Sequence, residues 1–352
     1  MIKPEINKLL QEGTVIPAHP LALTPQRKLD ETRQRALTRY YLDSGAGGIA
    51  VGVHTTQFEI REKQYNLLEP VLRLAAEEVK NASLDRPFIK VAGVTGQVDQ
   101  AEKEAELALK YDYDLALVSN GSLPGYSELE LIRRTEKIAE IMPVFGFYLQ
   151  PAVGGKVLSF DFWQDFAQIT NVMAIKMAPF NRYQTLDVVR AVCHSPRYHE
   201  IALYTGNDDN ILVDLLTDFS FEIDGKIREK TIVGGLLGHW AVWTRKAVEL
   251  LEKIKNIKAS GNNIPASMLS KGIAITDTNA AFFDAANQFK GCIAGIHEVL
   301  RRQGLLEGTW CLNPEEQLSE GQAEEINRVY HQYPELNDDA FVQANLIKWL
   351  KK

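Results

Sequence analysis

Short apolar segments alternate with longer amphipathic stretches along most of this 352-residue chain, and this alternation restricts the fold more than any other feature. A stretch with helical character follows each apolar segment. Strands that alternate with helices predict βαβ units in a parallel sheet, and eight such units favour closure into a (β/α)8 TIM barrel. The eight apolar segments, which have the continuous character of strands buried on both faces, are Thr14–Ala18, Gly48–Val53, Phe88–Ala92, Leu115–Val118, Val144–Tyr148, Val172–Lys176, Ile201–Tyr204 and Thr231–Gly235.

The predicted barrel is followed by a region that is mostly helical. A small polar segment, Ala259–Ile264, has the composition of a loop. We therefore expect two domains, a (β/α)8 barrel catalytic domain over residues 1–258 and a C-terminal helical extension over residues 259–352. The helical stretches expected in the extension are Asn279–Gln303, Ser319–Tyr333 and Asp338–Leu350.

Charge and cysteine content restrict the partners and the compartment. The formal net charge of −7 argues against a nucleic-acid partner or an anionic membrane surface. We find neither a targeting leader nor an apolar run of ~20 residues, so we expect no membrane association. The three cysteines, Cys193, Cys292 and Cys311, show no CxxC spacing and are expected to be reduced thiols of a cytoplasmic protein.

Two polar side chains stand where apolar strands stop, at the edge where barrel enzymes place their active sites. The segment VMAIK ends at Lys176. Burial there would lower the lysine pKa and leave a neutral amine able to attack a carbonyl, whereas a lysine that reaches solvent past the strand end is the alternative. The segment PVFGFY ends at Tyr148, whose hydroxyl is suited to proton transfer but whose ring is equally suited to capping the barrel mouth.

The second apolar segment leads into His54, Thr55 and Thr56. Two adjacent hydroxyls and their backbone N–H groups form a compact set of donors for a carboxylate, and His54 is a polar group at the same mouth. Threonine is also an ordinary strand residue whose hydroxyl bonds to the backbone. The pair alone therefore leaves both interpretations open.

Taken in order, these residues resemble the dihydrodipicolinate synthase and N-acetylneuraminate lyase family. Members carry a hydroxyl pair after the second strand, a Tyr followed three residues later by Pro after the fifth, and a Schiff-base Lys at the end of the sixth. This chain has Thr55-Thr56, YLQP at 148–151 and AIK at 174–176. The separation of Tyr148 and Lys176 (176 − 148 = 28) is similar to the family's spacing. The resemblance covers residues 13–255 in order and, more loosely, 279–330.

The resemblance implies a class I lyase, either an aldolase or a dehydratase/hydratase, that acts on a pyruvate-type 2-oxo acid and on a hydroxylated sugar-acid derivative or another aldol of pyruvate. Lys176 would attack the keto carbon, Thr55 and Thr56 would hold the carboxylate, and Tyr148 would shuttle protons. The covalent imine through Lys176 is the electron sink, so no metal or other cofactor is expected. An aldehyde partner and a homo-oligomer, dimer or tetramer, are further expectations.

The chain departs from the family pattern in three places. The usual Gly-Thr-Thr-Gly-Glu is HTTQFE at 54–59, so Gln57 replaces a glycine and we expect the carboxylate loop to differ. After the fourth strand, SNGSLPGY at 119–126 replaces a Pro-Tyr-Tyr segment, with Tyr126 as the nearest tyrosine. The arginine usual in the synthases after Tyr…Pro is missing from AVGGKV at 152–157, where Lys156 offers one point charge. These differences argue against dihydrodipicolinate synthase activity and favour the sugar-acid lyase branch.

The seventh strand is followed by Gly206-Asn207-Asp208-Asp209. This segment is similar to the Gly-x-Asp-Glu of sialic acid lyases, where acidic groups meet sugar hydroxyls. It implies that Gly206 and Asp208 line the substrate site, because a carboxylate accepts several hydrogen bonds from a polyol. The alternative is an N-cap for the helix that begins near Asn210.

Two other classes of function stay open. The altered loops fit a regulatory protein that binds 2-oxo acids without turnover, although such a protein needs neither Lys176 nor Tyr148. A metal-dependent barrel aldolase or isomerase would use His19, His54 and His239, which each follow a strand. The chain has no HxH or HExxH spacing, so we expect these histidines to line the pocket or to be structural rather than to bind a metal.

Overall fold

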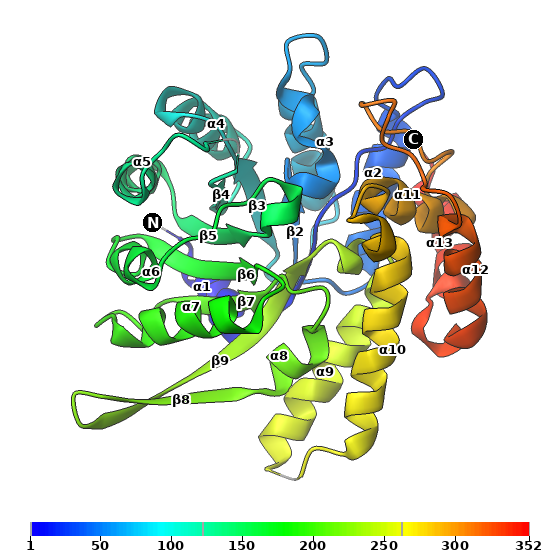
Figure 1. Cartoon of the computed structure of the whole chain (residues 1–352). Helices are drawn as coiled ribbons and strands as arrows, with labels where there is room; N and C mark the ends of the chain where they lie inside the picture. Colours follow the sequence, from blue (N-terminus) through cyan, green and yellow to red (C-terminus); the bar gives the residue numbers. More distant parts are fainter. Residues whose placement is uncertain (1, 122, 262, 352) are drawn as a thin grey trace. The chain divides into compact units, whose positions relative to one another are not determined.

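The computed structural model describes residues 2–121, 123–261 and 263–351, and within them strands and helices alternate as predicted (Figure 1). The fold is a (β/α)8 TIM barrel with a C-terminal helical region. The parallel strands of the described residues are β1 (Val15–Pro17), β2 (Gly48–Val51), β3 (Ile89–Val94), β4 (Leu115–Ser119), β5 (Val144–Leu149), β6 (Val172–Ala178), β7 (Ala202–Thr205) and β9 (Lys226–Leu237).

Helices follow these strands in turn, and several begin at a residue whose side chain caps the first turn. Asp30 accepts a hydrogen bond from the backbone of Arg33, and Ser127 forms a capping box with Glu130. The sequence expectation of one helix after each strand is confirmed. The helices are α2 (Glu31–Asp43), α3 (Leu68–Asn81), α4 (Val98–Lys110), α5 (Glu128–Ile141), α6 (Phe160–Phe166), α7 (Arg182–His194), α8 (Ile211–Leu216) and α9 (Thr244–Ser260).

The chain divides into two compact units, and the first consists of the N-terminal segment to Thr14 with Ile89–Leu236. Its strands lie in the order β9-β7-β6-β5-β4-β3, all parallel, with α4, α5, α6 and α7 along one side of them (Figure 1). A further helix, α1 (Pro4–Glu12), belongs to this unit. The hydroxyl of Tyr204 donates to the carbonyl of Leu10 and so ties β7 to α1.

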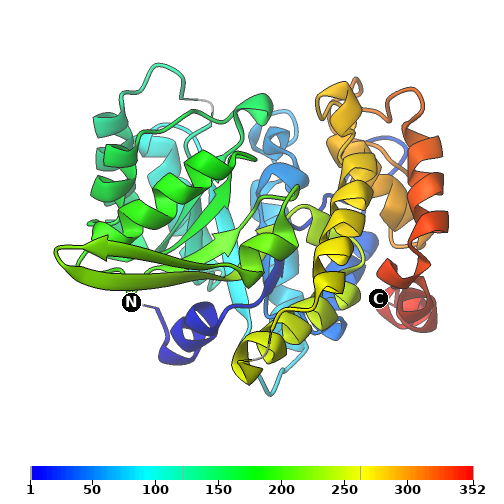
Figure 2. The same cartoon turned by 60° about the horizontal axis from the view of Figure 1, so that its bottom comes forward.

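A two-stranded ribbon in the first unit was not expected from the sequence. Strand β8 (Asp218–Ile223) runs antiparallel to the first half of β9, joined by Asp224 and Gly225, which both have positive φ (Figure 2). The Asp-Gly dipeptide is a hairpin turn signal, but the ribbon is half exposed and polar, so its strands show no continuous apolar run. Arg228 donates to the carbonyl of Cys193 and Lys230 to that of Tyr198, so the ribbon is fastened to the end of α7 and the segment after it.

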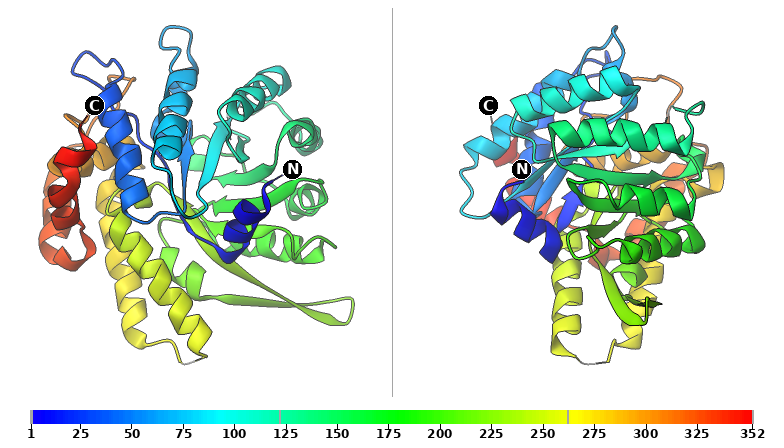
Figure 3. Two further views of the ribbon diagram at one scale, coloured as in Figure 1. Left: turned by 180° about the vertical axis from the view of Figure 1, so that it is seen from behind. Right: turned by 90° about the vertical axis from the view of Figure 1, so that its left-hand side faces the viewer.

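The second unit consists of Val15–Phe88 and the chain from Leu237 onward. In it β1 and β2 lie parallel through a bridge between Ala18 and Ala50, and α9 lies beside α10 (Ala266–Phe282; Figure 3). Helix α10 was not expected, since its Ser, Thr, Gly and Ile residues are weak helix formers. The expected helix over Asn279–Gln303 is interrupted, because Asp284 and its neighbours adopt left-handed backbone conformations. The remaining helices are α11 (Cys292–Arg302), α12 (Gln322–Gln332) and α13 (Asp339–Trp349).

The described helices include none with the length and apolar character needed to cross a bilayer.

Candidate active site

Lys176 lies on one face of the parallel strands of the first unit, together with residues of β4, β5 and β7. It lies in register with Phe147 of β5 and Tyr204 of β7, and Phe147 lies in register with Ser119 of β4. Register partners in a parallel sheet present their side chains to the same face, so these four residues share one face. The Nζ atom of Lys176 lies 4.2 Å from the centroid of the Phe147 ring. The amine of Lys176 therefore lies against the Phe147 ring and does not extend into solvent.

Burial changes the acid–base behaviour of Lys176. Its side chain is buried, and this burial lowers its pKa from 10.5 to about 8. The negative charge of Asp208, which is also buried, acts in the opposite direction and raises the same pKa. A pKa of about 8 leaves about a tenth of the amine neutral at pH 7, against well under a thousandth for an ordinary lysine. The amine is therefore available as a nucleophile near neutral pH.

Gly206 makes room for the lysine side chain. A Cβ atom at position 206 would lie 2.4 Å from Cε of Lys176 and 2.8 Å from Cβ of Ala178. Such contacts are far inside van der Waals distance, so a larger residue would displace Lys176. The backbone N–H of Gly206 donates to the carbonyl of Met177, which fixes the loop after β7 against β6. Gly206 thus belongs to the candidate site through its contact with the lysine.

The loop that carries Asp208 is held by a buried carboxylate, Asp214. Thr205 Oγ1 donates to Asp214 Oδ2 at 2.6 Å, and Asn207 Nδ2 donates to the same oxygen at 3.0 Å. Asn210 occupies the N-cap position of α8, but its side chain makes no capping bond and instead donates to Asp214 Oδ1. Asn210 therefore stands at the N-cap position without capping the helix through its side chain. The N-cap interpretation does not account for the burial of Asp208, which lies two residues from Gly206.

Tyr148 lies on the opposite face of β5 from Phe147. The pairs Val144–Val172 and Phe145–Ala174 show that the register between β5 and β6 shifts by one residue, from an offset of 28 to one of 29. Lys176 is consequently paired with Phe147 (176 − 147 = 29) and Tyr148 with Met177. The Tyr148 ring packs 5.1 Å from that of Trp163, and its hydroxyl accepts a 3.3 Å hydrogen bond from the Leu158 N–H.

The threonine pair lies in the second unit, in the short 3-10 helix η1 (His54–Thr56) after β2. Thr56 is buried, and its hydroxyl donates to the carbonyl of His19 at 2.7 Å and accepts from the N–H of Gly52 at 3.0 Å. Those bonds fix the loop and occupy the hydroxyl. These bonds do not involve the hydroxyl of Thr55.

Gln57 adopts the left-handed backbone conformation that a glycine would adopt most easily, with φ of 69°. Its buried side chain accepts a hydrogen bond from the backbone N–H of Leu312 in the C-terminal region. The loop that begins at His54 is thus joined through Gln57 to the C-terminal helical region.

The three histidines of the metal hypothesis have separate surroundings. His19 Nε2 lies 2.9 Å from the hydroxyl of Thr38, the His54 ring contacts Phe58, and the His239 ring stacks on Phe282. Burial lowers the pKa of both His19 and His239 to about 4. Over residues 2–121, 123–261 and 263–351, no group of three His, Cys, Asp or Glu side chains is placed to hold a metal ion.

Known proteins share the sequence pattern and the fold. The chain matches no protein-family model. It is 27% identical over 203 residues to an N-acetylneuraminate lyase of Citrobacter koseri, a match that covers 56% of this chain and 64% of the lyase, less than two thirds of its length. The structure is similar to a dihydrodipicolinate synthase from Oceanobacillus iheyensis, with a TM-score of 0.72 and 18% identity over 94% of this chain and 99% of the synthase. It is also similar to an N-acetylneuraminate lyase from Fusobacterium nucleatum solved with pyruvate, with a TM-score of 0.68 and 16% identity over 93% of this chain and 99% of that one.

The chain is therefore similar in sequence to an N-acetylneuraminate lyase and in fold to dihydrodipicolinate synthases and N-acetylneuraminate lyases. Lys156 was expected to offer one point charge in place of the arginine that is usual in the synthases. Its Nζ donates to the carbonyl of Tyr126 at 2.5 Å, so its charge joins the loops after β4 and β5. Sequence reasoning missed Phe147 as the neighbour of Lys176. Strand alternation places Phe147 and Tyr148 on opposite faces, but choosing between them required the register between β5 and β6.

Proposed function

We propose that this protein is a class I lyase that forms a Schiff base between Lys176 and a pyruvate-type 2-oxo acid. The observation that carries the proposal is the buried Lys176 amine with its pKa lowered to about 8, lying across the backbone of Gly206. A regulatory protein that only binds 2-oxo acids has no use for an activated amine. The sequence match to an N-acetylneuraminate lyase supports the same reaction class.

The proposed reaction begins with the neutral amine. The Nζ lone pair of Lys176 forms a bond to the keto carbon, and the carbonyl oxygen takes up a proton to give a carbinolamine. Loss of water from the carbinolamine leaves a protonated imine, which accepts the electron pair released when the C–C bond of an aldol breaks or when a proton is removed from the carbon next to the imine. In a dehydration, the resulting enamine then expels the neighbouring hydroxyl group, which takes the C–O electron pair and leaves as water after taking up a proton. Asp208 is the carboxylate whose charge acts on Lys176, so we assign it the proton transfers at nitrogen.

The remaining site residues have proposed roles in binding. Thr55 would hold the 2-oxo acid carboxylate in the loop that Thr56 fixes, with His54 beside it. Asp208 would also accept hydrogen bonds from the hydroxyls of a sugar-acid substrate, and an aldehyde would be the second product of an aldol cleavage. The covalent imine makes a further cofactor unnecessary for this chemistry.

The family resemblance predicts Tyr148 as the proton relay. In this structure its hydroxyl bonds to the Leu158 backbone on the face opposite Lys176. A relay through Tyr148 therefore requires its side chain to turn during the reaction.

The test is intact-protein mass spectrometry after incubation with pyruvate and borohydride. We expect one reduced pyruvyl adduct on the wild type and none on Lys176→Ala. The matched control is Lys230→Met, because burial lowers the pKa of Lys230 to about 8 as well, although its amine donates to Tyr198. No adduct with pyruvate or with other 2-oxo acids, or an adduct that Lys230→Met removes, would refute the proposal.

A further inference from the structure

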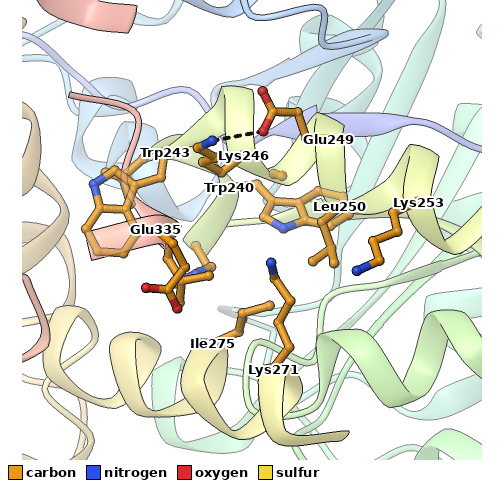
Figure 4. A pocket seen from close by; sticks show the side chains of 13 residues that line it. Trp240, Trp243, Lys246, Glu249, Leu250, Lys253, Lys271, Ile275 and Glu335 are labelled. Carbon is orange, nitrogen blue, oxygen red and sulfur yellow. Dashed lines mark hydrogen bonds and ion pairs between the residues drawn. The ribbon is translucent and has the colours of Figure 1, made fainter. Parts of the chain in front are cut away.

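A cavity lies in the second unit. It has a volume of about 210 Å³ and is formed by α9, α10 and the 3-10 helices η4 (His239–Ala241) and η6 (Pro334–Leu336; Figure 4). Cavities that hold drug-sized ligands measure ~300–1,000 Å³, so this one suits a smaller molecule. None of its lining residues belongs to the proposed catalytic set.

The floor of the cavity is apolar. It includes the indole of Trp240 and the side chains of Leu250 and Ile275, all of them buried. Trp240 comes from the short helix after β9, Leu250 from α9 and Ile275 from α10, so three elements with their own packing define its shape. Such a floor favours the flat or branched apolar body of a small ligand.

Lysine side chains surround this floor. Lys246 is neutralised by Glu249, whose carboxylate lies 3.0 Å from its Nζ. In the described part of the chain, Lys253 and Lys271 also line the cavity, and neither has an ion pair or hydrogen bond there. Figure 4 shows Lys271 extending from α10 toward Trp240, with Lys253 on the same side and Glu335 at the other end of the cavity. One end of the cavity is therefore positively charged without an internal counter-ion.

We propose that this cavity is an accessory site for a small organic anion with an apolar body. Its carboxylate or phosphate binds Lys271 and Lys253, and its apolar body lies on Trp240 and Ile275. A neutral molecule would leave both ammonium groups unpaired, and a purely inorganic anion would leave the apolar floor exposed to water. Lys176 does not line this cavity, so the accessory site can be tested independently of the proposed lyase reaction.

The test is isothermal titration of the whole protein at low ionic strength with benzoate, with benzyl alcohol as the neutral analogue and with inorganic phosphate. We expect saturable binding of one benzoate, at least fivefold tighter than that of the other two probes. Added salt should weaken it, because the lysines are partly exposed. Lys176→Ala should bind benzoate as the wild type does, which excludes binding at the candidate active site.

Matched variants locate the site. Lys271→Met and Lys253→Met should each weaken benzoate binding at least fivefold, and Lys255→Met, on α9 but outside the cavity, should leave it unchanged. Absence of saturable benzoate binding, equal binding of benzyl alcohol or of phosphate, or insensitivity to Lys271→Met would each overturn the proposal.

Discussion

The side-chain oxygen of Gln57 accepts a hydrogen bond of 2.6 Å from the backbone N–H of Leu312, 255 residues further along the chain. Two neighbouring contacts join the same parts of the second unit. The Tyr65 hydroxyl donates to the carbonyl of Leu312 at 3.2 Å, and Arg27 Nε donates to that of Cys311 at 2.9 Å. The C-terminal region therefore fastens the loop that carries the threonine pair.

Replacing Gln57 should loosen this attachment. Gln57→Ala leaves the buried N–H of Leu312 unpaired and keeps the cost of a positive φ, so we expect the free energy of unfolding to fall by about 1–3 kcal/mol. Gln57→Gly removes the backbone strain and should cost about 1 kcal/mol less than the alanine variant. Urea denaturation measures both values. The control is Gln317→Ala, because Gln317 lies in the same segment as Leu312 but is exposed. Equal stability of all three variants would contradict the role of Gln57 in holding that segment.

Adding one methyl group at Gly206 should block the lysine. In Gly206→Ala the new Cβ would lie 2.4 Å from Cε of Lys176, so the side chain must leave its position. We expect the yield of borohydride-trapped adduct per folded protein to fall at least tenfold. The thermal midpoint should fall as well, because the new Cβ would also lie 2.8 Å from Cβ of Ala178, which is fixed to the backbone of β6. Gly125→Ala is the control, since a Cβ there meets no atom within 4 Å. A wild-type yield from Gly206→Ala would exclude this packing of Lys176.

The pH dependence of imine formation should report the lowered pKa of Lys176. The reacting form is the neutral amine, whose fraction rises with pH, so the rate should rise to a plateau with a midpoint near pH 8 rather than 10.5. Asp208 raises this pKa, so Asp208→Asn should move the midpoint to a lower pH. Rates of reductive trapping between pH 6 and 10 give both midpoints. An unchanged or higher midpoint in Asp208→Asn would show that the Asp208 carboxylate does not raise the pKa of Lys176.

Tyr148→Phe distinguishes the observed side-chain orientation from a catalytic one. Because the Tyr148 hydroxyl bonds to the Leu158 backbone on the other face of β5, we expect its loss to slow adduct formation only severalfold and to cost about 1 kcal/mol of stability. Stopped-flow trapping and urea denaturation measure the two effects. A loss of a hundredfold or more in rate, with stability unchanged, would instead show that Tyr148 turns toward Lys176 and relays protons as the family resemblance predicts.

Sequence reasoning succeeded where one local pattern was sufficient. The apolar run that ends at Lys176 predicted the strand and singled out its buried lysine, because continuous burial leaves a distinct composition and a lysine interrupts it. It did not detect the β8–β9 ribbon, whose residues are half exposed and therefore mixed in character. It also joined α10's last residues to α11, because the left-handed turn at Asp284 has no glycine or proline to mark it.

The sequence by itself determined the number and order of the barrel strands, the family pattern and the choice of Lys176. The tertiary structure decided which side chains surround that lysine. A one-residue shift of register between β5 and β6 exchanges Phe147 for Tyr148 beside Lys176, because neighbouring residues of a strand face opposite sides. Pairing across strands depends on the packing of the whole sheet. The separation of 28 residues between Tyr148 and Lys176 along the chain therefore could not decide which residue of β5 lies beside Lys176.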